Sequence, residues 1–487
     1  MPQSQNHILS KSKILSLLQC PKRLWLEHYR PELAVADEGV QGRMAAGSRT
    51  GEIARGLFPG GILVEGQSMA ERIRQTGELL LSHSGPLYEA AFRHNNVRVM
   101  ADILLPESDG FTLIEVKSAT SVKDYHLQDA AIQTWVLQGA SLDLRRIEVA
   151  VIDSGFVYPG HGDYRGLFYR VDVSREVWAL LPDVPGWVRE GLTVLASPAE
   201  PVQPPDDQCH TPFACPFWEH CAPETTEYPV ESLPRIGSLA KTLRAQGLRD
   251  IRELPDSVPL SAAQRRVRDV TKSGRAVLSA EASAIVNSLP WPRWHMDFET
   301  IAFVVPEWAG TRPYQQIPFQ WSCHVAMADD TLRHCEFLAD EDVDPRRVFA
   351  ESLISGMAGT GPVLVYNAAF EKRILRETAE AFPDLAGELH AIAARIFDLL
   401  PLARQHYYHP DMHGSWSLKN VLPTVAPELS YAELSVSHGG EAQAAFLEML
   451  AMQKGSAERE SLRHSLLEYC ERDTYALVVL ARFFAGQ

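Results

Sequence analysis

The chain has 487 residues, 45% of them hydrophobic, and carries a formal net charge of −16 at pH 7. This length allows roughly two to four domains, and the absence of any apolar run of about 18 residues excludes a transmembrane helix. The negative charge counts against a nucleic-acid-binding protein, since a phosphate backbone attracts positive surfaces, although metal-binding carboxylates would add to the same charge. Basic residues interrupt the apolar ones near the N-terminus and no small-residue cleavage site follows, so we expect no signal peptide, a cytoplasmic location and no membrane partner.

Residues 1–225 form the first predicted domain. It opens with a helical pattern of apolar residues, namely Ile14, Leu17, Leu18 and Leu24. Two segments rich in β-branched and other apolar residues follow, VRVMADILLP and FTLIEVKSA, and both predict strands. The next segment, DYHLQDAAIQTWVLQGA, predicts a helix that ends at Gly139.

Three polar residues fall on the two predicted strands: Asp102 on the first, and Glu115 and Lys117 on the second. Strand alternation places Glu115 and Lys117 on the same face. Two carboxylates that meet at one point can bind Mg²⁺ or Mn²⁺ through oxygen. A lysine beside them can orient or deprotonate a water and stabilise charge on a phosphate. Taken alone, the triplet is also compatible with a solvated strand face.

This D…E-x-K arrangement resembles that of the PD-(D/E)XK nucleases. The resemblance implies a restriction-endonuclease-like core in which Asp102, Glu115 and Lys117 are catalytic, with both carboxylates as metal ligands. RecB-like members place a glutamine on the following helix, where this chain has Gln133, and Glu89 just before the strands is a further candidate. Those enzymes usually carry a histidine on an earlier helix, and Glu52 stands in that place here.

Seven cysteines, an odd number, favour metal binding or free thiols over disulfides in a large cytoplasmic chain. Three of them are evenly spaced in a proline-flanked segment, Cys209, Cys215 and Cys221, and Cys20 lies far upstream. Zinc is one alternative for four thiolates, but zinc sites usually take their ligands in two close pairs. The other three cysteines lack ligand spacing, and we expect them to be small buried residues: Cys323, Cys335 and Cys470.

One distant N-terminal cysteine with three clustered ones resembles the iron–sulfur RecB-like nucleases, which include the CRISPR-adaptation nuclease family. The resemblance implies a 4Fe–4S cluster that ties the two ends of the nuclease domain together. Four thiolates suit such a cluster. The D…E-x-K triplet lies between Cys20 and Cys209, where that family has it.

Residues 226–290 read as a polar helical linker punctuated by prolines. The segment SLAKTLRAQGLRDIRELP predicts a helix, a glycine turn and a second short helix, which is similar to a helix-hairpin-helix; a plain helical linker is the alternative. Residues 241–275 contain nine basic and four acidic residues, so positive charge is concentrated in this stretch of an acidic chain.

Residues 291–487 alternate predicted strands and helices, as in a mixed α/β domain. The strand WHMDFETIAF aims Asp297 and Glu299 at one face. The buried strand PVLVYN leads into a helix that carries Glu371. Near the C-terminus, Tyr469 and Asp473 are four residues apart on one face of a long predicted helix.

These segments together resemble the tyrosine-type DnaQ-like (DEDD) exonucleases of the ribonuclease H-like fold. The resemblance implies two divalent ions held by carboxylates about 3.5–4 Å apart, with Tyr469 positioning the attacking water. In those enzymes an aspartate follows the phenylalanine of the second motif. Glu371 stands there in this chain, and Asp398 competes as the fourth ligand. Ser417 and Lys419 could contact substrate, although a helix cap with a solvated lysine is the simpler reading.

The sequence therefore predicts an α/β multidomain nuclease: a PD-(D/E)XK core and a ribonuclease H-like domain joined by a helical linker. We expect it to hydrolyse DNA, single-stranded or at ends and including 3′–5′ trimming, in DNA repair or defence, with RNA as the alternative substrate. Two other hypotheses stay open: that only one site is active and the other holds nucleic acid, or that the chain is a non-catalytic iron–sulfur interaction module.

Overall fold

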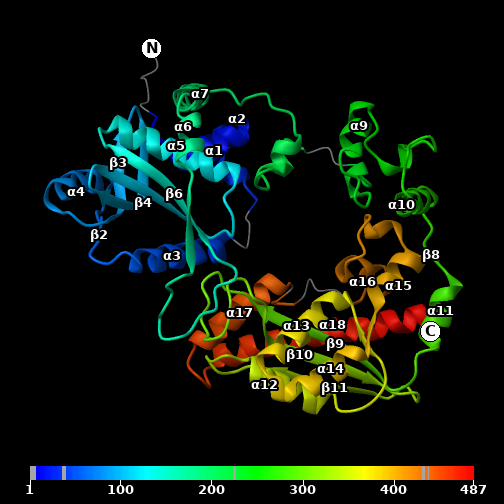
Figure 1. Ribbon diagram of the computed structural model, residues 1–487. Coiled ribbons are helices and arrows are strands. Elements are labelled where there is room, and N and C mark those ends of the chain that lie inside the picture. The colour runs from blue at the N-terminus through cyan, green and yellow to red at the C-terminus, as the bar shows by residue number, and fades with distance from the viewer. Residues whose placement is uncertain (1–6, 36–39, 223–225, 430–433, 437) are drawn as a thin grey trace. The chain divides into compact units, whose positions relative to one another are not determined.

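Figure 1 shows the computed structural model, which describes residues 7–35, 40–222, 226–429, 434–436 and 438–487. The α/β chain divides into two compact units. The first contains Met1–Pro223 and Phe303–Tyr314, and the second contains Glu224–Ala302 and Gln315–Gln487. Within the described ranges, no helix has both the length and the apolar character needed to cross a membrane.

The first unit is built on a mixed seven-stranded sheet of order β2-β3-β4-β5-β6-β7, with β1 paired to β4. The pairs β3–β4, β4–β5 and β6–β7 are antiparallel, whereas β1–β4, β2–β3 and β5–β6 are parallel. The strands are β1 (Leu9–Ser10), β2 (Ile62–Leu63), β3 (Leu87–His94), β4 (Val97–Glu107), β5 (Gly110–Lys117), β6 (Leu144–Ile152) and β7 (Phe168–Asp172).

Helix α5 packs on this sheet through small and branched residues such as Ala131 and Val136, which share a core with Leu113 and Val149. A Cβ at Gly139 would lie 2.2 Å from the ring of His94, so a glycine is needed where α5 ends against β3. The helices are α1 (Lys11–Gln19), α2 (Pro21–Tyr29), α3 (Val40–Gly56), α4 (Met69–Ser82), α5 (Asp124–Gly139), α6 (Ser174–Leu180), α7 (Val184–Ala196) and α8 (Trp218–Cys221), with 3₁₀ turns η1 (Pro31–Leu33) and η2 (Asp207–Cys209).

The predicted N-terminal helix is divided in two. Cys20 adopts an extended conformation between α1 and α2, and Pro21 begins the second helix. A proline is tolerated at a first helical position because its missing N–H would have no partner there. The break turns the chain at the first of the four clustered cysteines.

The second unit contains a five-stranded sheet of order β11-β10-β9-β12-β13, in which β9, β10 and β11 are antiparallel and β12 runs parallel to β9 and β13. A separate small sheet pairs β14 with β8. The strands are β8 (Val277–Leu278), β9 (Arg293–Ile301), β10 (Ile317–Ala326), β11 (Leu332–Leu338), β12 (Val363–Val365), β13 (Ile396–Asp398) and β14 (Tyr407–Tyr408).

The two faces of this sheet differ in chemistry. Met296 and Phe298 of β9 pack into an apolar core with Phe349 and Leu375, whereas the alternate residues of β9 face the long helix α18. The helices are α9 (Leu239–Ala245), α10 (Ala262–Ser273), α11 (Ala280–Asn287), α12 (Arg346–Gly356), α13 (Ala368–Ala381), α14 (Ala386–Ala394), α15 (Leu399–His406), α16 (Leu418–Val425), α17 (Gly439–Ala451) and α18 (Ala457–Ala485), with 3₁₀ turns η3 (Val230–Ser232), η4 (Ile251–Glu253), η5 (Pro383–Leu385) and η6 (Pro410–Met412).

The segment 226–290, read from the sequence as a linker, is packed into the second unit. Val230 and Val267 share a hydrophobic core with Leu477 and Phe484 of α18. The predicted helix and glycine turn are present as α9 and Gly247, and the second short helix is the 3₁₀ turn η4. This segment therefore contributes to the core of the second unit instead of only joining two domains.

The segment Phe303–Tyr314 belongs to the first unit although it follows β9 directly. Its Gly310 N–H donates to the carbonyl of Tyr158 at 2.8 Å, and the Tyr158 N–H donates to Thr311 at 3.0 Å. Val305 packs with Tyr158 and Tyr164 in a small apolar cluster. The chain consequently passes between the two units three times.

Candidate active sites and metal centres

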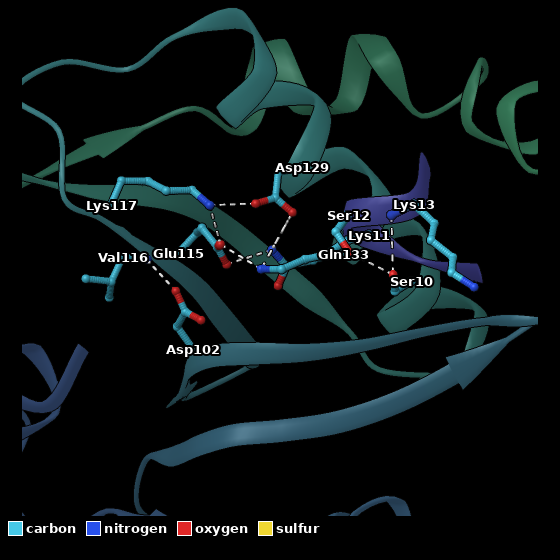
Figure 2. A network of polar contacts seen from close by, with 10 residues as sticks. All are labelled: Ser10, Lys11, Ser12, Lys13, Asp102, Glu115, Val116, Lys117, Asp129 and Gln133. Atoms are coloured by element: carbon cyan, nitrogen blue, oxygen red, sulfur yellow. Dashed lines mark hydrogen bonds and ion pairs between the residues drawn. The ribbon is translucent and has the colours of Figure 1, made fainter. Parts of the chain in front are cut away.

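The predicted triplet of the first unit meets at the junction of β4 and β5. Asp102 comes from β4, and its carboxylate accepts a 2.8 Å hydrogen bond from the Val116 N–H of β5, between Glu115 and Lys117. Figure 2 shows the three side chains converging from the two strands. The pairing of Ile103 with Ile114 fixes this register.

Glu115 is the centre of the group, and its side chain is 1% exposed. The ammonium groups of Lys117 and Lys11 lie 2.6 and 2.8 Å from its Oε1, and the amide of Gln133 donates to Oε2 at 2.6 Å (Figure 2). Asp129 of α5 completes the network with an oxygen 2.6 Å from Lys117. The structure thus brings Gln133 into the site, together with two residues that sequence reasoning missed, Lys11 and Asp129.

The charges in this pocket control one another. Burial and the charge of Glu115 raise the pKa of Asp102 to about 7. Burial alone would also raise the pKa of Glu115, but Lys11 and Lys117 hold it well below its usual value. Burial would lower the pKa of Lys117, yet the charges of Glu115 and Asp129 raise it. Three acidic groups against two ammoniums make the pocket attractive to a divalent cation.

A cavity of about 360 Å³ opens beside these carboxylates, lined by Asp102 and Glu115 and by Glu89 and Arg55. Glu89 interrupts β3 at a left-handed φ of 52°, a conformation that costs free energy for a residue with a side chain. Burial raises the pKa of Glu89, and Arg55 of α3 lies 3.5 Å from its carboxylate. Glu52 is not part of this cavity wall: it is largely exposed and pairs with Arg49 at 2.9 Å.

The four cysteines predicted to act together line one small cavity in the first unit, next to Lys22. The Cys215 N–H donates to the Cys209 carbonyl at 2.8 Å, which folds this loop tightly. Gln19, at the end of α1, donates to two carbonyls of the same loop, at 2.7 and 2.8 Å, so it fixes the loop against the helix that precedes Cys20. Burial raises the pKa of Cys215 and Cys221.

Of the other cysteines, Cys323 and Cys470 are buried and Cys335 is half-buried beside Cys323.

In the second unit, Asp297, Glu299 and Asp473 meet in space. One carboxylate oxygen from each lies within 4.8 Å of the other two. β9 supplies the first two from its α18-facing side, and α18 supplies Asp473, which is 176 residues away from Asp297 in the sequence. This is the spacing that carboxylates bridged by a common cation require.

The carboxyl groups of this site raise one another's pKa. Burial first, and then Asp473, Glu299 and Glu371, raise the pKa of Asp297 well above its usual value. Burial and Asp473 raise the pKa of Glu299 to about 8, although Lys419 opposes the shift. Buried acidic groups held together in this way are typical of sites that bind divalent ions.

Glu371 and Asp398, the two candidates for a fourth ligand, have different environments. Both oxygens of Asp398 accept backbone hydrogen bonds, from Asn367 and Leu400 at 3.0 and 2.9 Å and from Ala368 at 3.0 Å. Glu371 is buried, and its Oε2 has no hydrogen-bond partner among the described residues. Glu371 also acts on Asp297 electrostatically, so the geometry favours it over Asp398.

Tyr469 is buried one helical turn before Asp473 on α18. The Lys419 ammonium lies 5.9 Å from the centre of its ring, within cation–π range. Lys419 follows the N-cap residue Ser417 of α16, whose hydroxyl forms no cap bond to the helix backbone. Lys419 is exposed, as expected for a solvated lysine, and its charge also acts on Glu299.

The second unit also contains a cavity of about 1070 Å³, whose wall includes Asn367, directly before α13, and Leu418, the first residue of α16. Its wall combines Arg235, Arg266 and Arg404 with the aromatic residues Tyr366 and Trp416. The Arg266 guanidinium lies 5.2 Å from the centre of the Trp416 ring. Cationic and aromatic groups side by side are suited to a strand of nucleotides. Sequence reasoning noted the basic stretch 241–275; Arg266 is the basic residue of that stretch that lines this cavity.

Residues 294–417 match a family described as a domain of unknown function, DUF2779. The chain is also similar to an uncharacterized protein, UU173, from Ureaplasma parvum serovar 3, with 24% identity over 213 residues. That alignment covers 39% of this chain and 30% of the relative. No solved structure matches the chain. The family match spans β9 to the start of α16 and includes Asp297, Glu299 and Glu371.

Proposed function

We propose that the protein is a divalent-metal-dependent nuclease with two active sites, one in each unit. The observation that carries the proposal is the meeting of Asp297, Glu299 and Asp473, which come from a strand and a distant helix. Burying three carboxylates together is costly unless a cation joins them. Mg²⁺ and Mn²⁺ prefer such oxygen ligands.

In the second unit we infer a DnaQ-like exonuclease of ribonuclease H-like fold. Asp297, Glu299, Asp473 and Glu371 would hold the ions, which when bound supply a nucleophilic water and stabilise the leaving 3′ oxygen. Tyr469, one turn from Asp473, would orient the attacking water. The arginine- and aromatic-lined cavity beside the site would hold the unpaired strand, since stacking and phosphate contacts are independent of sequence.

In the first unit we infer a PD-(D/E)XK nuclease of the RecB-like type. Asp102 and Glu115 would bind the metal in the 360 Å³ cavity, and Glu89 on its wall could add a third oxygen. Lys117, whose ammonium lies 2.6 Å from Glu115, would orient a water or stabilise charge on a phosphate. Lys11 and Gln133 orient Glu115, so they act as positioning residues.

The four cysteines fit a 4Fe–4S cluster because four thiolates line one cavity, whereas zinc sites usually take their ligands in two close pairs. Cys20 comes from the start of this unit and the other three from its end. The cluster would therefore connect the two ends of the nuclease unit. Its role is structural, since no residue of the D…E-x-K group lines that cavity.

The proposed substrate is DNA, single-stranded or at ends, cut in a repair or defence process. We would measure cleavage of 5′- and 3′-labelled single- and double-stranded DNA and RNA with Mg²⁺ or Mn²⁺. Asp297→Asn should abolish stepwise 3′ trimming, and Lys117→Ala should abolish the remaining cleavage. The exposed residues Asp329 and Lys454 provide matched controls, Asp329→Asn and Lys454→Ala.

The pattern of losses distinguishes the alternatives. Loss of all activity in one single variant would mean that the other unit only holds nucleic acid. Absence of metal-dependent cleavage in the wild-type protein would leave the non-catalytic iron–sulfur module. Cleavage of RNA alone would correct the substrate. If neither single variant lost any activity, both site assignments would be wrong.

A further inference from the structure

A second group of metal-ligating side chains lies in the second unit, outside the carboxylate site. His324 of β10, His334 of β11 and Glu471 of α18 each offer one ligand atom within 4.8 Å of the others. The two histidines are directly paired across the antiparallel strands, with ring centres 4.6 Å apart. The Nδ1 of His334 lies 3.8 Å from the Oε1 of Glu471.

Hydroxyl groups hold both rings in position. The Nδ1 of His324 lies 2.9 Å from the hydroxyl of Thr474, and the Nε2 of His334 lies 2.9 Å from the hydroxyl of Ser322. The two hydroxyls lie 2.8 Å from each other. These bonds account for one nitrogen of each ring, which leaves the other for a ligand. Metal-binding histidines typically have their second nitrogen fixed by such a neighbour.

The chemistry of these donors differs from that of the carboxylate site. Imidazole nitrogen suits Zn²⁺ and other transition ions, whereas Mg²⁺ prefers oxygen. Two histidines and one glutamate are a known donor set for zinc, with positions left over for water. The site has a solvent-facing side, because the Glu471 side chain is 49% exposed and that of His334 is 23% exposed.

We propose that His324, His334 and Glu471 bind a divalent transition-metal ion, with Zn²⁺ as the expected occupant. The ion would join three elements: the edge strand β11, its neighbour β10 and the helix α18. Glu471 and Asp473 are two residues apart on α18, and about 200° of helical rotation separates them. Glu471 thus faces β11 while Asp473 faces β9, so the two sites are distinct. This inference does not rest on the proposed nuclease function.

The test is zinc binding by the intact protein. A chelator first removes bound metal, and isothermal titration with ZnCl₂ then gives the number and affinity of the zinc sites. Because the cysteine cavity can also take zinc, the informative quantity is the difference between variants. His334→Ala and Glu471→Gln, both at accessible positions, should each remove one equivalent of bound zinc. Thr474→Val, which replaces the hydroxyl by a methyl group, should weaken the binding of that zinc ion about 10- to 100-fold.

His390→Ala, an exposed histidine on α14, is the matched control and should leave all equivalents unchanged. Asp297→Asn should also leave this equivalent unchanged, because it alters the carboxylate site alone. Co²⁺ would give a second readout: His334→Ala should lose visible d–d bands, whereas any sulfur charge-transfer band from the cysteine cavity should stay unchanged. Equal zinc stoichiometry and affinity in the wild type, His334→Ala and Glu471→Gln would overturn the proposal.

Discussion

In the absence of metal ions, the free energy of unfolding of the second unit should fall as the pH rises, because the buried Glu299 must ionise. Burial and the neighbouring Asp473 raise its pKa from 4.5 to about 8. The folded protein therefore keeps a proton that the unfolded chain has already lost between these two values. Since the unfolded state binds fewer protons in this window, the free energy of unfolding falls as the pH increases through it.

The size of the effect follows from the same two values. Each pH unit of difference corresponds to about 1.4 kcal/mol. The rise in pKa from 4.5 to about 8 therefore lowers the free energy of unfolding by roughly 5 kcal/mol once Glu299 is fully ionised in the folded protein. Part of this loss has already occurred at pH 6, so we expect a fall of about 3 kcal/mol between pH 6 and pH 9 from this one carboxyl group.

The assay is urea unfolding at pH 6 and pH 9 in EDTA, followed by tryptophan fluorescence. Glu299→Gln should reduce the fall by about 3 kcal/mol, whereas the exposed control Glu388→Gln should not change it. Mn²⁺ should restore the stability of the wild type at pH 9, because the ion replaces the proton as the partner of the carboxylates. An identical pH dependence in Glu299→Gln and the wild type would refute the reasoning.

Three further predictions concern other parts of the chain. Gly414 has a φ of 74°, and a Cβ there would lie 1.7 Å from the Ser232 carbonyl oxygen, so Gly414→Ala should destabilise the second unit by more than about 2 kcal/mol in thermal unfolding. Gly237→Ala, with φ 54° and open space around it, should cost less and serves as control. Arg404→Ala, at an exposed arginine of the large cavity, should weaken binding of single-stranded DNA and lower the salt dependence of log K by about one, measured by anisotropy at several salt concentrations; an unchanged slope would contradict its role. Cys209→Ser should lose bound iron and the absorbance at about 400 nm in anaerobically purified protein, and full retention of both would exclude Cys209 as a ligand.

Most elements that carry the candidate sites could be predicted because their signals are local. The segments read as strands around Asp102, Glu115 and Asp297 are β4, β5 and β9, and the segment ending at Gly139 is α5. Alternation along a strand is enough to place Asp297 and Glu299 on one side. Asp129 could have been found in the same way, since it precedes Gln133 by one helical turn.

The remaining features depend on contacts between distant parts of the chain. Lys11 lies 104 residues before Glu115, and no local pattern indicates that α1 begins beside β5. The choice of Glu371 over Asp398 rests on which backbone N–H groups reach Asp398, which only the folded chain determines. The segment 226–290 has the polar, proline-punctuated pattern of a linker, and its apolar residues, such as Val230, stand between polar ones; only in the folded chain do they complete a core.

The excursion of Phe303–Tyr314 into the first unit has a consequence for dissecting this protein. Cutting the backbone once cannot separate the two units completely. The strand β9, which bears Asp297 and Glu299 of the second unit, leads directly into Phe303–Tyr314, which belongs to the first unit. Cutting near residue 225 would leave the N-terminal fragment without the partners of Tyr158 and Tyr164. The role of each unit should therefore be tested by point substitutions in the intact polypeptide. We expect separately expressed fragments of the two units to aggregate.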